Sequence, residues 1–410
     1  MKKSSMIKLA AGAAAVLLMS TSAQAGYTMK KKVGDIDTKL TFYGFAQLEA
    51  VGGDGMKIKE SGSVAKANSD VAFRAQRIRL GWNYVAGKAF AKVFLDFNQK
   101  NDPGDAGSDA TDGAAMPGMI KDAFVGYLAD DAFFVKLGLM KMPNGMSFTM
   151  PGWNLDITER GLDKSLAMER NTGLMISGRD IGFGNNGKVN GFEMGHERPW
   201  IGFGYDIMVA NQASRSAAAN SIEFGGNAYA VRGMFDYTEK LHIEASYAVS
   251  ENADGLNALT TNGEDYSNYN IGIDSNLQEL SLKAEYFDAH NITGIKNYDE
   301  QVWTATAGYL VTPTLELVGK HMQGTAKNPA SATNSKSSEL GNTYLGFNFF
   351  INPPYEGFSR MEKRNRNQHK IAFNYIVASG NGATEVAADK WSGLSGYRAD
   401  AFIAQYQIKF

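Results

Sequence analysis

The sequence ends in "FIAQYQIKF", residues 402–410. Apolar side chains occupy every second position: Phe402, Ala404, Tyr406, Ile408 and Phe410. Polar side chains occupy the positions between them, except at Ile403. A period of two is that of a β-strand with one apolar and one polar face. The stretch therefore predicts a two-sided strand that continues to the last residue of the sequence.

The same period recurs along the chain, for example in "LTFYGFAQLEAV" (40–51), "LHIEASYAV" (241–249) and "VWTATAGY" (302–309). The connections between these stretches alternate between tight turns and long polar loops. Together they predict sixteen strands, at 39–52, 71–85, 88–98, 119–128, 132–141, 172–183, 199–211, 227–238, 240–250, 266–277, 280–290, 302–311, 314–323, 342–352, 367–379 and 399–410.

Residues 1–25 are typical of a signal peptide. Three lysines precede a short apolar run at 9–19, and "SAQA" (22–25) is a small-residue cleavage site. We expect the mature protein, residues 26–410, to begin at Gly26; the alternative is an uncleaved anchor. No later segment reaches 18 uninterrupted apolar residues, so no helical membrane span is predicted.

The composition excludes several classes of function. The chain has no cysteine, which removes thiol catalysis and zinc–thiolate sites. Its 41 basic and 43 acidic residues give a net charge of −2, and removal of the three signal lysines gives −5, so nucleic acid is not a predicted partner. The five histidines form no zinc-binding spacing and no serine lies in a nucleophile motif. We therefore predict no enzyme, no cofactor and no metal site.

An even number of strands of about ten residues, joined by short turns and long loops in alternation, is typical of an outer-membrane β-barrel. Lipid offers no hydrogen bonds, so a sheet that crosses it must close on itself. The sequence therefore predicts an all-β, sixteen-stranded antiparallel transmembrane barrel. A soluble periplasmic β-sandwich is the alternative, but it does not predict the alternation of loop lengths.

In a closed barrel the last strand pairs with the first. We expect 399–410 to pair with the first strand near "LTFYGFAQL" (40–48), because an open edge is unfavourable in lipid. Tyr406, Ile408 and Phe410 would then mark barrel closure on the lipid face. Ile403, on the lumen side, is not explained by this arrangement.

The loop at 142–171 is the longest and mixes apolar with charged residues. Such a composition favours a third outer loop folded into the lumen, although a packed surface loop remains open. Folded inward, the loop would narrow the channel and bring charges to the constriction: Glu159, Arg160, Lys164, Glu169 and Arg170.

The alternation of the early strands places further charges in the lumen, because Arg or Lys on the lipid face at mid-membrane costs about 2–4 kcal/mol. The residues concerned are Arg77, Arg79, Lys92, Asp96 and Lys136. Four of these five are basic, which favours a local preference for anions.

Two other motifs carry little weight. "GFGNNG" (182–187) has the glycine spacing of a dinucleotide loop but no following helix, so a glycine turn is favoured. Four aspartates in 101–113 lack the spacing of a calcium loop, so a solvated loop is favoured over divalent-ion binding.

Several segments resemble the phosphate-selective porin O and P family. They are "RAQRIRLGW" (74–82), "KVFLDFN" (92–98), "IKDAFVGY" (120–127), the region "LGLMKMPNGMSF … ITERGLDKSLAMERNTGLMISG" within 137–178, "YLGFNFFINP" (344–353) and "AQYQIKF" (404–410). The resemblance implies a sixteen-stranded trimeric porin whose arginines and lysines guide anions. One departure is Gln76, where the family often has an arginine beside the one that corresponds to Arg77.

These observations predict an outer-membrane porin that passes small hydrophilic solutes, with a preference for anions such as phosphate. The alternatives are a general or weakly cation-preferring porin, and a structural or adhesive surface protein. The expected partners are ionic solutes, outer-membrane lipid and lipopolysaccharide, two further copies of the chain in a homotrimer, and the barrel assembly machinery that recognises terminal aromatic strands in the resembling families.

Overall fold

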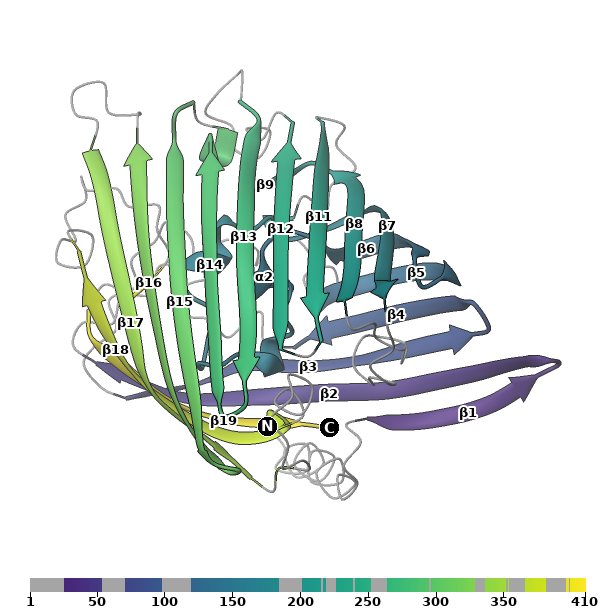
Figure 1. Ribbon diagram of the computed structural model, residues 1–410, viewed down its shortest axis with the longest axis horizontal. Coiled ribbons are helices and arrows are strands. Elements are labelled where there is room, and N and C mark those ends of the chain that lie inside the picture. Colours follow the sequence, from purple (N-terminus) through teal and green to yellow (C-terminus); the bar gives the residue numbers. More distant parts are fainter. Residues whose placement is uncertain are drawn as a thin grey trace, which may run out of the picture.

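Sixteen antiparallel strands form one closed barrel in the computed structural model (Figure 1). The structure describes residues 26–53, 71–97, 119–183, 201–214, 217–218, 226–238, 240–251, 264–294, 296–328, 336–351, 353, 366–380, 396–397 and 399–410. The predicted signal peptide, the aspartate-rich loop 101–113 and most of "GFGNNG" lie outside these residues, as does almost all of 353–366.

The barrel strands follow one another in chain order. They are β2 (Ile36–Gly53), β3 (Ala72–Ala86), β4 (Ala89–Asp96), β5 (Ile120–Asp130), β6 (Phe133–Lys141), β7 (Arg170–Phe183), β8 (Ile201–Asn211), β11 (Asn227–Tyr237), β12 (Leu241–Ser250), β13 (Tyr266–Leu277), β14 (Leu280–His290), β15 (Asp299–Thr312), β16 (Leu315–Asn328), β17 (Lys336–Phe350), β18 (His369–Ser379) and β19 (Ala401–Lys409). The predicted sixteen-stranded antiparallel barrel is thus confirmed.

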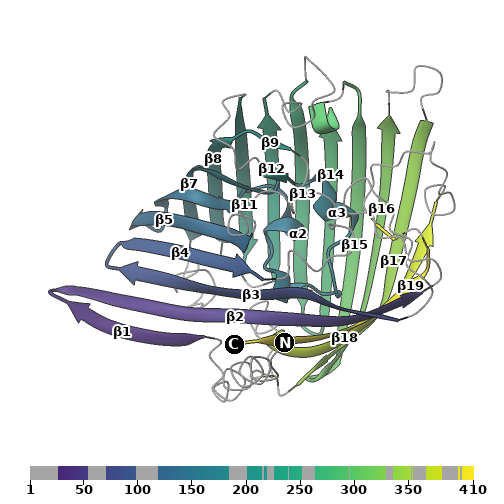
Figure 2. The ribbon, with the colours of Figure 1, turned by 180° about the vertical axis from the view of Figure 1, so that it is seen from behind.

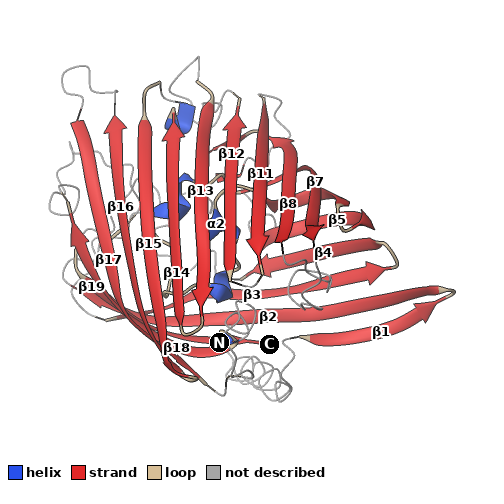
Figure 3. Ribbon diagram, viewed as in Figure 1, coloured by secondary structure: helices blue, strands red, loops and turns tan. Residues whose placement is uncertain are grey.

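The remaining elements are short. A two-stranded pair, β9 (Ala213–Ser214) and β10 (Ala217–Ala218), follows β8. The helices are α2 (Met146–Thr149), η2 (Gly152–Asn154), α3 (Leu162–Leu166) and η4 (Ile292–Gly294). They appear in blue against the red strands in Figure 3. No helix among the described residues is long and apolar enough to cross a membrane.

The last strand closes the barrel on the first, as predicted. β19 pairs with β2 from Ala401–Gly53 to Lys409–Phe45. Tyr406 is exposed on the outer face, while Gln405 and Gln407 are buried on the inner face. Ile403 is also buried on the inner side, within a large apolar cluster that includes Val51. That cluster explains the one residue for which the alternation gave no reason.

One strand was not predicted. β1 (Tyr27–Val33) pairs with residues 36–42 at the beginning of β2, along the same edge that β19 occupies further on. The β1–β2 hairpin extends beyond the neighbouring strands (Figure 2). Its run of three lysines, Lys30–Lys32, interrupts the period of two, so the strand is formed by pairing with β2 and not by an amphipathic pattern of its own.

Five short connections lie at one end of the barrel, between β3 and β4, β5 and β6, β11 and β12, β13 and β14, and β15 and β16. Tyrosines near this end and near the opposite rim are exposed on the outer face, by 41% for Tyr84, 47% for Tyr237, 52% for Tyr309 and 44% for Tyr375. Amphipathic rings at strand ends suit the interfaces of a bilayer.

Register shifts change which residues face inward. Between β2 and β3 the partner of Gln47 is Arg77 and that of Leu48 is Ala75, so Gln76 is an inserted residue. A similar shift in β5 inserts a residue at Lys121. A bulge of this kind reverses the alternation beyond it. As a result Arg74, opposite Glu49, faces inward together with Arg77 and Arg79.

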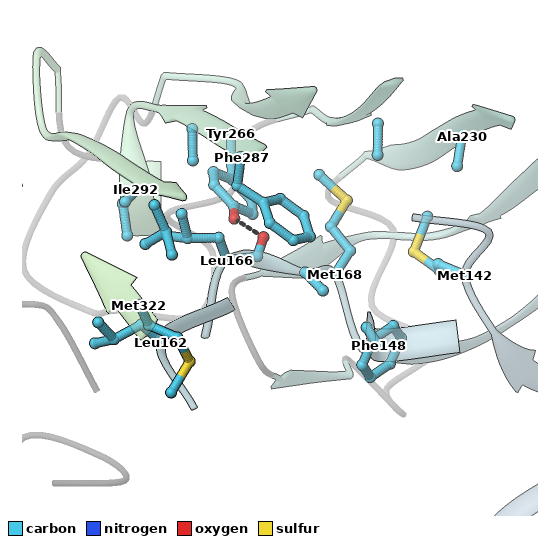
Figure 4. Packing of buried hydrophobic residues seen from close by; sticks show 14 of the residues in the cluster. Met142, Phe148, Leu162, Leu166, Met168, Ala230, Tyr266, Phe287, Ile292 and Met322 are labelled. Carbon is cyan, nitrogen blue, oxygen red and sulfur yellow. Dashed lines mark hydrogen bonds between the residues drawn. The ribbon is translucent and has the colours of Figure 1, made fainter. Parts of the chain in front are cut away.

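The largest apolar cluster lies on the inner side of the sheet (Figure 4). Leu162, Leu166 and Met168 are completely buried there against Phe287 of β14 and Met322 of β16. Tyr266 of β13 donates a hydrogen bond from its hydroxyl to the carbonyl of Leu166, at 2.5 Å. Burial of apolar surface stabilises a fold by about 25 cal/mol per Å². The apolar packing of Leu162, Leu166 and Met168 therefore stabilises the position of the 162–168 stretch.

Candidate functional site: a basic cavity beside residues 142–169

Residues 142–169 hydrogen-bond to inward-facing side chains of many strands. The Asn144 amide donates to Asn268 Oδ1 of β13 at 2.6 Å, and the Thr158 N–H donates to Asn374 Oδ1 of β18 at 2.9 Å. Gln405 of β19 donates to the carbonyl of Thr158 at 2.8 Å. These contacts fix the segment against the inner faces of β13–β19, which we term the anchoring wall.

Lysines of the anchoring wall reinforce these contacts. Lys320 lies 2.7 Å from Asp163, and Lys283 lies 2.7 Å from Asp156. Burial opposes ionisation of Asp163, yet Lys320 and nearby hydrogen bonds keep the pKa of its carboxyl below the ordinary value. Lys370 donates to the carbonyl of Leu155 at 2.7 Å. Each lysine thus provides a positively charged partner for a carboxylate or carbonyl group of the segment.

The carboxyl end of α2 is held by two cations. Lys141 Nζ donates to the carbonyls of Phe148, Thr149 and Met150 at 2.6, 3.2 and 3.1 Å. Arg160 donates to the carbonyls of Ser147 and Met150. Positive charge is favourable at the carboxyl end of a helix because the last carbonyls have no partner within the helix. Burial and nearby arginines lower the pKa of Arg160 to about 9, which leaves it charged at neutral pH.

Aromatic rings hold the middle of the segment against β2 and β4, which continue the barrel beyond the anchoring wall. Trp153 of η2 packs edge-on against Phe45 of β2 and Phe94 of β4, with ring centroids 5.2 and 6.4 Å apart. Lys409 of β19 lies over the Trp153 ring at 4.9 Å. The segment therefore contacts β2 and β4 as well as the anchoring wall.

A cavity of about 420 Å³ remains between the first half of the segment, 142–154, and strands β3–β8, β11–β13 and β19. Among the described residues, its lining includes eight Lys or Arg side chains and four carboxylates. The basic residues are Arg79, Lys92, Lys136, Lys141, Arg170, Arg179, Arg232 and Lys409. The acidic residues are Asp122, Asp206, Glu244 and Asp274, so the lining has an excess of positive charge.

The carboxylates of the lining are ion-paired within the protein. Asp122 lies 2.7 Å from Arg170 and 3.4 Å from Lys92. Asp206 lies 2.7 Å from Arg179 and 2.6 Å from Arg232. These pairs fix the basic side chains in position and leave the excess charge of the lining positive.

A family model described as Gram-negative porin matches residues 10–345, most of the chain. The chain belongs to the Gram-negative porin family. Together with the barrel, this membership makes the protein a channel of the bacterial outer membrane. No curated protein sequence matches this porin.

Solved structures share the fold at low sequence identity. The outer membrane channel DcaP of Acinetobacter baumannii superposes with a TM-score of 0.54 at 14% identity, over 94% of this chain and 100% of that one. An anion-selective porin from Comamonas acidovorans gives 0.54 at 12% identity, over 91% and 100%. A trimer form of OmpT from Vibrio cholerae gives 0.50 at 11% identity, over 91% and 99%.

The porin places the predicted strand residues close together. Arg79, Lys92 and Lys136 line the cavity, and Asp96 is buried 2.8 Å from Arg79. Arg77 is different: it is buried, donates to Gln47 Oε1 at 2.6 Å and is not part of the cavity lining. Its side chain packs near Gly152, where an added Cβ would lie 3.3 Å from Arg77 Cδ.

The predicted loop residues have separate positions. Arg170 lines the cavity and pairs with Asp122. Glu159 accepts a hydrogen bond from Arg74 at 3.1 Å, and Lys164 lies 3.7 Å from Glu169. Burial opposes ionisation of Glu169, but Lys164 and Arg170 lower the pKa of its carboxyl. Glu159, Arg160 and Lys164 are not among the residues that line the cavity.

Sequence reasoning missed several basic residues of the site. Arg179 of β7 lies two residues after the buried Ser177 and faces inward by simple alternation, next to a bulge marked by a positive φ of 53° at Asp180. Arg232 of β11 faces inward by simple alternation, opposite Asp206. The polar position within "NAYAVRGMFDY" (227–237) was a usable signal for Arg232, and the alternation within "RNTGLMISGRDIGF" (170–183) was a usable signal for Arg179.

Proposed function

We propose that this porin is a passive, water-filled diffusion channel for small hydrophilic solutes and that it prefers anions, phosphate among them. The observation that carries the proposal is the excess of basic over acidic side chains around the 420 Å³ cavity. Charged side chains that line a narrow passage set its ion selectivity. No catalytic role is proposed for any of them.

Arg79, Lys92, Lys136 and Arg170, which line the cavity, would attract anions directly. Asp96 and Asp122 would hold these cations in place through their ion pairs. Arg77, Glu159, Arg160 and Lys164 would act indirectly, by positioning residues 142–169. The predicted constriction residues thus divide into those that meet the solute and those that support the segment.

Residues 142–169 would form the inward-folded third loop that narrows the channel. The hydrogen bonds to β13, β18 and β19 and the packing of Trp153 on Phe45 support this assignment. The passage for solute would be the basic cavity, which lies beside residues 142–154.

The proposal includes export through a signal peptide at 1–25, contact with outer-membrane lipid and lipopolysaccharide, and recognition of Tyr406, Ile408 and Phe410 by the assembly machinery. It also includes a homotrimer. The trimer form recorded for OmpT of Vibrio cholerae, which shares the fold, supports that part. The anion selectivity named for the Comamonas acidovorans porin supports the preference proposed here.

Single-channel recording in a planar bilayer tests the proposal. With a tenfold KCl gradient we expect discrete conductance steps and a reversal potential of the sign given by chloride preference. Absence of conductance would favour a structural or adhesive surface protein. A reversal potential of the opposite sign would favour a cation-preferring general porin.

A further inference from the structure

The basic cavity has a second property that charge alone does not require: its cations alternate with aromatic rings. Lys92 Nζ lies 5.9 Å from the ring centroids of both Phe94 and Phe124. Lys136 Nζ lies 5.7 Å from Phe124 and 5.3 Å from Phe134. Neighbouring cations of the cavity thus share an aromatic ring between them.

The alternation continues at both ends. Arg79 Cζ lies 5.9 Å from the Phe94 ring, and Arg179 Cζ lies 5.7 Å from the Phe134 ring. Following the inward faces of β3–β7, the sequence of groups is Arg79, Phe94, Lys92, Phe124, Lys136, Phe134 and Arg179. All of these residues line the same cavity.

The opposite side of the cavity is largely apolar. From the 142–154 stretch, Met142, Met146, Met150 and Trp153 are among the residues that line the cavity. Thioether sulfur makes favourable contacts with aromatic rings and adapts to irregular shapes. The cavity therefore offers positive charge and apolar, π-rich surface within a volume of about 420 Å³, which is in the range of small-molecule sites.

We propose that the cavity is a recognition site for aromatic carboxylates, and that it retains them more strongly than small hydrated anions of the same charge. The carboxylate would lie against Lys92 or Lys136, and the ring would contact Phe124, Phe134 and the thioethers of the opposite side. A small inorganic anion can use only the charges. An aromatic anion can also exchange ring hydration for contact with rings and sulfur, which strengthens its binding.

This inference rests on the proposed anion preference but goes beyond it, and the two can fail separately. Chloride over potassium selectivity, from the KCl gradient, tests the preference alone. The inference is tested by comparing four anions as blockers of the chloride current at pH 8: benzoate, cyclohexanecarboxylate, acetate and phosphate. Cyclohexanecarboxylate matches benzoate in size and charge but lacks the π-system.

In the wild-type porin we expect benzoate to halve the chloride current at a concentration about tenfold lower than acetate, with cyclohexanecarboxylate between them. If benzoate blocks no better than cyclohexanecarboxylate and acetate in a chloride-selective channel, the inference is overturned and the anion preference stands. If phosphate blocks more strongly than benzoate, the site is selective for inorganic anions and the inference is again overturned.

A variant locates the effect. Phe124→Leu keeps an apolar side chain between Lys92 and Lys136 but removes the ring, so we expect the benzoate advantage over acetate to fall to about threefold or less. Phe203→Leu is the matched control, because Phe203 packs against Phe235 on the outer face and is 47% exposed there. The Phe203→Leu porin should retain the full advantage of benzoate over acetate as a blocker. Should Phe124→Leu fail to assemble, Phe134→Leu makes the same test between Lys136 and Arg179.

Discussion

Gly44 and Phe410 exchange two backbone hydrogen bonds, with N···O distances of 2.8 and 2.9 Å. The pair completes the seam between β2 and β19 at the last residue of the sequence. The Phe410 ring covers Gly44, so that a Cβ built on Gly44 would lie 2.7 Å from Phe410 Cε2 and 2.7 Å from the carbonyl oxygen of Arg79. Closure at this point therefore depends on the absence of a side chain at position 44.

Gly44→Ala should weaken the seam. The added methyl group forces the Phe410 ring and the β3 backbone apart, and overpacking of this kind costs about 1–3 kcal/mol. We expect the free energy of unfolding to fall by the cost of this overpacking, and urea unfolding of the porin in lipid vesicles measures the change.

Gly233→Ala is the control for that measurement. Gly233 lies on the outer face of β11 and has no atom within 4 Å of an added Cβ. Its replacement should leave the free energy of unfolding unchanged to within about 0.5 kcal/mol. Equal stabilities of the two variants would show that Phe410 does not constrain Gly44.

The strand count, the closing pair and the inward positions of Arg79 and Lys92 follow from the period of two. That period fails where a bulge occurs, because one inserted residue reverses the alternation. Arg74 was missed for this reason, because it lies beyond an insertion that no residue type announces. β1 was missed because its three consecutive lysines interrupt the period of two, and the strand is formed by pairing with β2.

The 142–169 segment shows a second limit of the sequence. Its mixture of apolar and charged residues predicts that it is buried, but not which residues meet the solute. Arg160 and Lys164 have the same side-chain types as the residues that line the cavity, yet one binds the carbonyls of α2 and the other lies near Glu169. That division is set by contacts with strands more than 100 residues away, such as Lys320 with Asp163.

Lys320→Met should destabilise the porin and loosen the segment. The substitution leaves Asp163, which is completely buried, without its 2.7 Å partner. Loss of one partner of a buried ion pair costs about 3–5 kcal/mol. We expect a lower free energy of unfolding and noisier single-channel current.

The double variant Lys320→Met with Asp163→Leu should be more stable than Lys320→Met alone, since no buried charge is left over. A double variant less stable than the single one would contradict this account.

The contribution of Asp163 should depend on pH in a defined direction. Its folded pKa lies below the ordinary value, which is about 3.9 in an unfolded chain. The stabilisation is therefore complete above about pH 4 and is lost as the pH falls through the folded pKa. The difference in unfolding free energy between wild type and Asp163→Asn should still be present at pH 5 and should shrink as the pH falls toward 3. A difference that already disappears between pH 6 and pH 5 would contradict the low pKa.

Lys136→Gln should reduce the preference for chloride over potassium. Lys136 lines the cavity between Phe124 and Phe134, and the proposed path would bring a solute ion within a few ångströms of it. A unit charge at such a distance in a hydrated passage contributes about 1 kcal/mol, or about fivefold in relative permeability. Lys31→Gln removes the same charge from the exposed β1 strand and should leave the reversal potential unchanged. The reversal potential of each variant in a tenfold KCl gradient measures the effect. Equal shifts in the two variants would mean that selectivity reflects the overall charge of the porin and that the cavity is not the selective site.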